Sequence, residues 1–141
     1  MKEVYWANQV EIQRQEVSAW LAFAEGDSPG ALAGMHAAAE QEDKTEKSVV
    51  TPGPLAPARE LLAELLLDLN RPSEALKEFE AALMKEPNRF RSLYGAAEAA
   101  KLAGDRSTAR TYFRRLLKAV ERADQPERRE MAEARSGAQP E

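Results

Sequence analysis

Hydrophobic positions along this chain follow helical spacing, and the helices they predict come in pairs. Within the stretch 3–24, four apolar residues recur at intervals of seven, four and three: Val10, Val17, Leu21 and Ala24. That spacing marks one face of a helix. Gly26 is expected to end this helix, because glycine adopts the left-handed backbone without a steric clash. An alanine-rich helix over about 29–42 would complete the first pair.

The same alternation of apolar stretches and turn residues predicts two more pairs. Their helices are expected over about 55–69 and 72–85, and then over about 88–103 and 105–123. Pro72 suits a first helical turn, whereas Pro87 should stop the preceding helix. A short helix at about 126–134 would cover the apolar face that the last pair leaves open.

Residues 56–123 also repeat themselves with a period of 34 residues. In this register, small, turn-forming and aromatic residues coincide: Ala63 with Ala97, Asn70 with Gly104, Ala75 with Ala109, and Phe79 with Phe113. A unit that begins at Ile12 places Gly26 at the same turn position. A fixed period of this length is typical of stacked-repeat proteins. We therefore expect three units, at about 12–45, 56–89 and 90–123.

These units resemble the tetratricopeptide repeat, a 34-residue helix–turn–helix motif with small residues where its helices cross. The matching residues are Ala19, Gly26, Ala31 and Ala38 in the first unit, Ala63, Ala75, Phe79, Ala82 and Pro87 in the second, and Ala97, Gly104, Ala109 and Phe113 in the third. The resemblance implies an all-α, right-handed helix–turn–helix solenoid of about three tetratricopeptide-like units with a C-terminal capping helix.

The expected layout is one repeat domain over 1–135 followed by a flexible tail at 136–141. Between the first two units lies a proline-rich insert at 46–55, which we interpret as a loop, either a plain spacer or a lip on a binding surface. The repeats could also belong to a longer array, because the sequence alone does not show whether Met1 is the natural start.

The resemblance also implies where a partner would bind, since the first helix of each unit lines a concave groove in that family. The transferred positions are Gln13, Glu16, Trp20, Phe23 and Ala24; Pro57, Glu60, Glu64, Leu67 and Asp68; and Arg91, Tyr94, Glu98, Lys101 and Leu102. From these we expect a partner-binding groove formed by Glu16, Trp20, Phe23, Glu64, Asp68, Arg91, Tyr94 and Glu98. Aromatic anchors around an acidic centre favour a peptide or helix with apolar and basic character. The alternative is that the three aromatic residues simply pack against neighbouring helices.

Two other interaction modes stay open. Short solenoids expose apolar ends, so Tyr5 and Trp6 could pack on a second copy of the chain and make a homo-oligomer. Nucleic-acid binding is the less favoured mode. It would use a basic ridge on one helical face, formed by Arg106, Arg110, Arg114, Lys118 and Arg122. Acidic neighbours dilute that charge, and no aromatic stacking platform accompanies it.

Composition narrows the chemistry further. The chain contains no cysteine, one histidine and a formal net charge of −4, so thiol chemistry is excluded and an overall attraction to nucleic acid is not expected. His36 and Glu40 make only half of a metal site, and no nucleophile–base pair or phosphate-binding loop is present. We expect no enzyme activity, no cofactor and no metal. No stretch suits a membrane span, so we expect a cytoplasmic protein.

Overall fold

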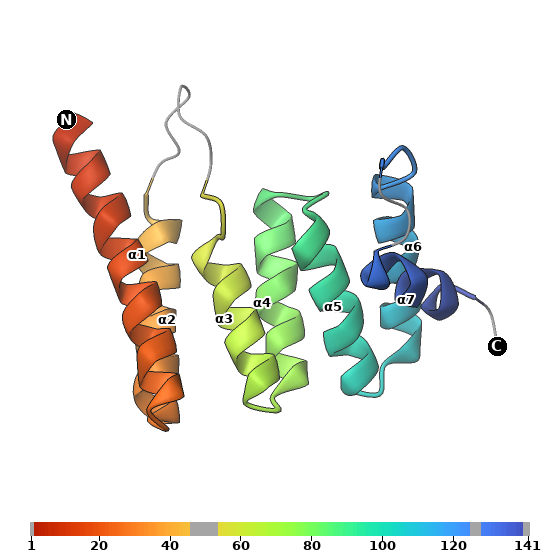
Figure 1. Ribbon diagram of the computed structural model, residues 1–141, viewed down its shortest axis with the longest axis horizontal. Helices are drawn as coiled ribbons and strands as arrows, with labels where there is room; N and C mark the ends of the chain where they lie inside the picture. The colour runs from red at the N-terminus through yellow and green to blue at the C-terminus, as the bar shows by residue number, and fades with distance from the viewer. Residues whose placement is uncertain (1, 46–53, 125–127, 140–141) are drawn as a thin grey trace.

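The computed structural model describes residues 2–45, 54–124 and 128–139, and within these ranges it contains seven helices and no strand. The helices are α1 (Lys2–Ala24), α2 (Ser28–Asp43), α3 (Ala58–Asp68), α4 (Pro72–Lys85), α5 (Phe90–Leu102), α6 (Arg106–Ala119) and α7 (Arg129–Gly137). Helices α1 to α6 stand side by side along the long axis of the molecule, and α7 lies across α6 (Figure 1). The all-α prediction is confirmed.

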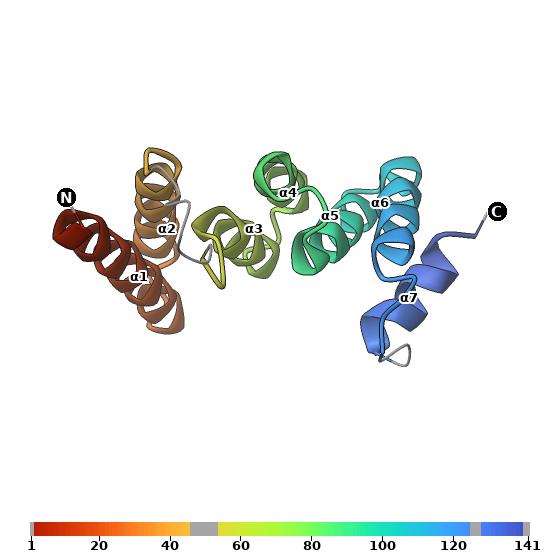
Figure 2. The same cartoon turned by 90° about the horizontal axis from the view of Figure 1, so that it is seen from above.

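Each helix packs against the next one in the chain, and the helices form two layers. Helices α1, α3, α5 and α7 make one layer, and α2, α4 and α6 make the other (Figure 2). The two end helices of the first layer stand forward of α3 and α5, so this layer lies on the inside of a shallow arc. We call the side of α1, α3, α5 and α7 that lines the inside of this arc the inner face.

The three turns inside the helix pairs share one backbone conformation, which is direct evidence for the repeat register. Gly26, Asn70 and Gly104 have φ angles of 88°, 56° and 83°, in the left-handed region. After each of them, the next backbone N–H reaches five residues back to a carbonyl at 2.8–2.9 Å. This is the hydrogen bond of a Schellman ending. Asn70 thus performs the role that glycine performs in the other two units.

The core is built from small residues at the helix crossings and from one large side chain per unit. Ala63, Ala75, Ala97 and Ala109 are all buried. Small side chains at these positions allow the paired helices to approach closely. Met35, Phe79 and Phe113 are also buried, at equivalent positions of the second helix in each unit. They fill the space between one unit and the next.

Two glycines on the inner layer receive the phenylalanine rings. A β-carbon added to Gly95 on α5 would lie 2.2 Å from Cζ of Phe79, and one added to Gly137 on α7 would lie 2.4 Å from the Phe113 ring. Both distances are far below van der Waals contact. Helix α7 therefore receives the Phe113 ring as α5 receives the Phe79 ring, although α7 lies across α6 whereas α5 runs alongside α4 (Figure 1).

The helix bounds differ from the expected ranges mainly near the C-terminus. Helix α6 ends at Ala119, four residues before the expected bound, and α7 begins and ends three residues later than the expected helix at 126–134. Ser136 and Gly137, expected in the tail, belong to α7, while 140–141 lie outside the described residues. Of the insert at 46–55, positions 46–53 also lie outside them. Leu55 is exposed, and its carbonyl accepts a hydrogen bond of 2.5 Å from Arg89.

A candidate protein-binding face

Trp20 and Phe23, the aromatic residues predicted for the first unit, lie together on α1. Their ring centroids are 5.9 Å apart and their planes meet at 80°, an edge-to-face arrangement. Both side chains are half-buried and pack against the core. Each ring therefore packs against neighbouring helices, as one interpretation of the sequence expected. Each also keeps part of its surface exposed, as an anchor for a partner requires.

Tyr94, the aromatic residue predicted for the third unit, is tied to the closing helix. Its hydroxyl donates a hydrogen bond to the Glu133 carboxylate, which also accepts one from Arg129 at 2.7 Å. Burial and the neighbouring carboxylates raise the pKa of the Tyr94 hydroxyl. Nearby, the Arg128 guanidinium lies 4.7 Å from the Phe90 ring centroid. Tyr94 thus helps to hold α7 on α5, and its hydroxyl is not free for a partner.

The acidic residues predicted for the centre of this face differ in their surroundings. Glu64 is half-buried and pairs with Arg91 at 2.5 Å, while Glu98 pairs with Lys101 at 3.2 Å. Burial raises the pKa of Glu64, and Arg91 opposes that shift. Asp68 is exposed at the end of α3 and makes no ion pair with the described residues. Of these carboxylates, Asp68 is the one most open to an incoming cation.

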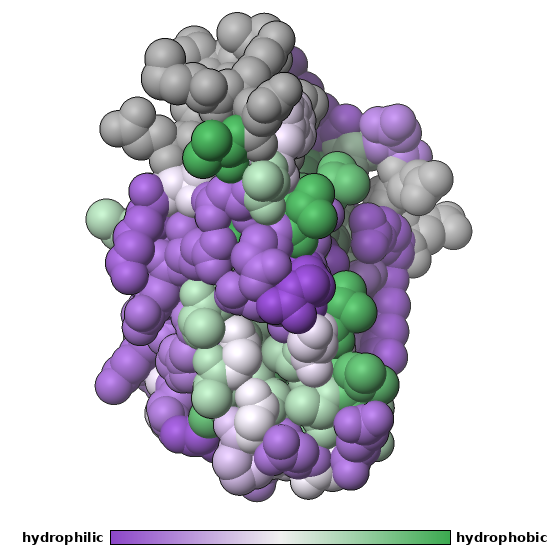
Figure 3. Space-filling view, turned by 90° about the vertical axis from the view of Figure 1, so that its left-hand side faces the viewer, coloured by the Kyte–Doolittle hydropathy of each residue, from purple (hydrophilic) through white to green (hydrophobic). Residues whose placement is uncertain are grey.

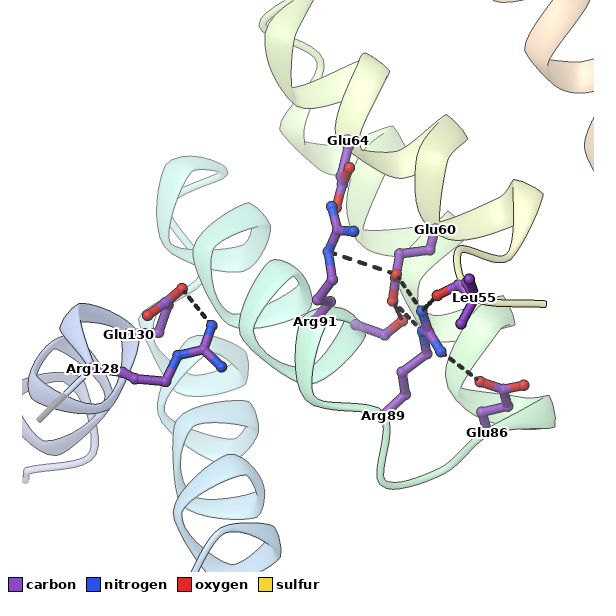
Figure 4. A network of polar contacts seen from close by, with 9 residues as sticks. Leu55, Glu60, Glu64, Glu86, Arg89, Arg91, Arg128 and Glu130 are labelled. Atoms are coloured by element: carbon purple, nitrogen blue, oxygen red, sulfur yellow. Dashed lines mark hydrogen bonds and ion pairs between the residues drawn. The ribbon is translucent and has the colours of Figure 1, made fainter. Parts of the chain in front are cut away.

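Glu60, which the resemblance placed on the exposed side of the groove, is instead fully buried. Its carboxylate accepts hydrogen bonds from Arg89 at 2.8 and 3.0 Å and from the Ser92 hydroxyl at 2.5 Å. Arg89 also pairs with Glu86 at 3.2 Å, so its guanidinium lies between two acidic side chains (Figure 4). The group joins α3 to the start of α5. Pro57, another transferred position, is buried as well.

Glu16 is a second departure from the expected groove, because only 9% of its surface is exposed. Within the described part of the chain, its carboxylate has no hydrogen-bond partner. Loss of hydration, together with repulsion from Glu42, raises the pKa of Glu16 to about 7. Glu42 itself accepts a hydrogen bond from the Ala58 backbone N–H at 2.8 Å. Glu16 therefore faces the junction of the first two units rather than a partner.

The basic residues of α6 are partly used within the molecule. Arg114 donates to the Ala138 carbonyl at 3.3 Å. Arg115 donates to the Pro87 carbonyl at 3.2 Å and lies 5.2 Å from the Tyr112 ring centroid. The hydrogen bonds to the Ala138 and Pro87 carbonyls hold α6 to its neighbours, and the first of them uses Arg114, one residue of the predicted ridge.

Metal ligands do not gather in the described ranges, where no group of three histidine, aspartate or glutamate side chains could hold an ion. His36 is exposed on α2. None of the helices in these ranges combines the length and the apolar character that crossing a bilayer requires.

Solved structures confirm the tetratricopeptide-like fold. PcrH from Pseudomonas aeruginosa aligns over 91% of this chain and 89% of its own, with a TM-score of 0.67 and 16% identity. A TPR-like protein from Chlorobium tepidum aligns over 95% and 96%, with a TM-score of 0.63 and 20% identity. No protein-family model and no curated protein sequence matches this chain. At these identities the similarity concerns the fold, a helical repeat architecture.

Proposed function

We propose that this protein binds a segment of another protein on its inner face, and that this segment carries both apolar and basic side chains. One observation carries the proposal. The half-buried rings of Trp20 and Phe23 lie on the same layer as the exposed carboxylate of Asp68, and the helices that bear them are in contact. Aromatic residues often dominate binding energy, and complementary charge selects the partner.

The two aromatic residues are suited to act as apolar anchors because the fold already restricts them. Their edge-to-face contact and their packing on the core fix both rings before a partner arrives. Ordering a side chain at an interface typically costs about 0.5–1.5 kcal/mol, and a preordered ring avoids much of that cost. Half-buried Leu67 on α3 would extend the apolar contact.

The charged residues would set the direction of the bound segment. A basic side chain of the partner would meet Asp68 first, because Glu64 is already neutralised by Arg91. On α5, Arg91 and Glu98 would border the segment, and Tyr94 would contribute its ring while its hydroxyl stays bonded to α7. The expected ligand therefore places its apolar residues against α1 and its basic residues against α3.

Affinity capture from a cell lysate tests this proposal with three baits. The first is the native chain, the second carries Trp20→Ala with Asp68→Lys, and the third carries Met84→Ser on the opposite layer, where Met84 is exposed. Circular dichroism first checks that all three have the same helicity. The expected result is a protein retained by the native chain and by Met84→Ser and lost from the double variant.

A synthetic peptide from the captured protein then separates direct from indirect binding. Its affinity, measured by calorimetry, should fall at high salt, because screening weakens exposed charge pairs. Equal capture by all three baits would contradict the inner face as the binding site. So would a partner segment that lacks basic residues.

A further inference from the structure

The most regular apolar face of α1 points away from the rest of the molecule. Trp6, Val10, Val17 and Leu21 are 49%, 63%, 69% and 57% exposed. The buried face of the same helix carries Ile12, Glu16 and Ala19 instead. Figure 3 looks on to this end of the solenoid, where hydrophobic residues gather below and beside a band of hydrophilic ones. We call the four exposed side chains the α1 stripe.

The spacing of the α1 stripe is symmetric about its own centre. Its residues are separated by four, seven and four positions, so the pattern is the same in either direction along the helix. The midpoint falls between Gln13 and Arg14. A second α1 laid antiparallel across this midpoint would bring Trp6 against Leu21 of the other copy, and Val10 against its Val17. All four stripe residues of each copy would then be in contact.

We propose that the α1 stripe is a homodimer interface, in which two copies of this chain pair their α1 helices antiparallel about a two-fold axis. A two-fold interface uses the same surface on both subunits, which is therefore self-complementary. The symmetric spacing of the stripe meets that condition. Binding to a different protein would not require the spacing to be symmetric.

The residues at the axis are compatible with this arrangement. Gln13 is uncharged, and the Arg14 guanidinium is bonded to Glu11 of its own helix at 2.7 and 2.8 Å. These hydrogen bonds lower the pKa of Glu11 to about 2, so the pair stays ionised together. The charge of each Arg14 is thus balanced locally when two copies meet near the axis.

The exposed apolar area of the α1 stripe sets the affinity that we expect for the dimer. It exposes on the order of 500 Å² of apolar side chain per copy, within the range of the largest apolar patches on monomeric proteins. A standard interface buries roughly 800 Å² per partner, so we expect a dimer that forms at micromolar concentrations. Helix α1 has 23 residues against 16 in α2 and stands taller than its neighbours (Figure 1), and its four stripe residues are exposed.

The first experiment measures molar mass by light scattering over a concentration series. The measured molar mass of the native chain should rise from 15.6 kDa towards about twice that value as the concentration increases. The variant Val10→Glu with Val17→Glu should keep the mass of one chain with unchanged helicity, since both positions are exposed. The control variant, Met84→Glu with Leu102→Glu, alters exposed apolar residues elsewhere and should still dimerise.

A second experiment tests the antiparallel register and uses the absence of cysteine from the chain. Mixed under oxidising conditions, Val10→Cys and Val17→Cys should form a disulfide with each other. Neither should link to its own copy, because antiparallel pairing separates like positions by about 10 Å along the helix.

Three results would overturn the proposal. They are a single-chain mass at every concentration up to several hundred micromolar, a dimer that survives both glutamate substitutions, and self-linking of Val10→Cys as in a parallel pair. The substitutions leave unchanged Trp20, Phe23 and Asp68, the residues that carry the proposed binding on the inner face. Failure of dimerisation therefore leaves the capture experiment on the inner face unaffected.

Discussion

The Phe79 ring occupies the space where Gly95 would carry a β-carbon. That carbon would lie 2.2 Å from Cζ of the ring, so the aromatic residue of the second unit requires a glycine on the first helix of the third. Phe113 and Gly137 repeat the relationship one unit later. Through this contact the short helix α7 packs closely on α6.

Substitution of Gly95 by alanine should destabilise the fold. The added methyl group must displace the buried Phe79 ring, and overpacking of this kind typically costs about 1–3 kcal/mol. Gly34→Ala is the matched control, because its β-carbon would lie 3.4 Å from that of Ala19, an ordinary contact. Alanine there should stabilise α2 by about 0.5–1 kcal/mol. Urea denaturation of both variants tests the prediction, and equal effects would contradict it.

Removal of Arg89 should be among the most damaging single changes in the protein. Arg89→Ala removes the cation closest to the fully buried Glu60 carboxylate and leaves only Arg91 at 3.8 Å; breaking a buried pair typically costs about 3–5 kcal/mol. Arg71→Ala, which breaks only the exposed pair with Glu74, should change the stability far less, because solvent screens exposed ion pairs. Adding Glu60→Gln to Arg89→Ala should recover part of the loss, and denaturation midpoints would show whether it does.

Glu16 should make the fold less stable in mild alkali than in mild acid. Its pKa is raised from 4.5 to about 7 in the folded chain, so the folded state binds a proton more tightly than the unfolded state does. Its favourable contribution is complete below about pH 4.5 and is lost as the pH rises through about 7. Glu16→Gln should therefore raise the melting temperature at pH 8 and change it little at pH 4.5. Each unit of pKa difference corresponds to about 1.4 kcal/mol.

A useful control for this pH dependence is Glu11→Gln, because the hydrogen bonds from Arg14 lower the pKa of the Glu11 carboxyl, whereas the pKa of Glu16 is raised. That variant should show no gain in melting temperature at pH 8. A Glu16→Gln variant whose melting curve follows the native one at every pH would show that the carboxyl is hydrated in solution.

The turn at Asn70 should accept glycine and resist alanine. Asn70 has a φ of 56°, a conformation that costs most L-residues roughly 1–2 kcal/mol. Asn70→Gly should leave stability within about 0.5 kcal/mol of the native value, whereas Asn70→Ala should lower it by about 1 kcal/mol. Thermal melts of the pair measure the difference directly, and a neutral Asn70→Ala would contradict the shared turn conformation.

Most of the fold could be predicted because its signals are local and repeated. Glycine or asparagine at a fixed turn position and small residues at fixed crossings determine both the helix pairs and their register. Gly26, Asn70 and Gly104 show this most clearly, since three different stretches of sequence produce the same backbone. The ends of α6 and α7 were less predictable, because few residues there stop a helix.

The candidate site could be predicted only in part, since exposure depends on neighbours that a repeat pattern does not describe. Glu60 is buried because Arg89 and Ser92 happen to lie opposite it. The Tyr94 hydroxyl already donates a hydrogen bond within the molecule, because α7 places Glu133 beside it. Similarly, the apolar spacing of Val10, Val17 and Leu21 correctly indicated a helix, but these residues face outward. Periodicity identifies an apolar face without showing which surface covers it.

The packing of each helix on its neighbour in the chain also affects how fast this protein should fold. The helices contact mainly the ones next to them in the chain, so little chain entropy is lost before the first contacts between helices form. Proteins with such topology fold in microseconds to milliseconds. Folding should begin in any one helix pair and then extend to the helix pairs on either side, as in other linear repeat proteins. The chain can therefore acquire its central units, α3 to α6, before its two ends are in place.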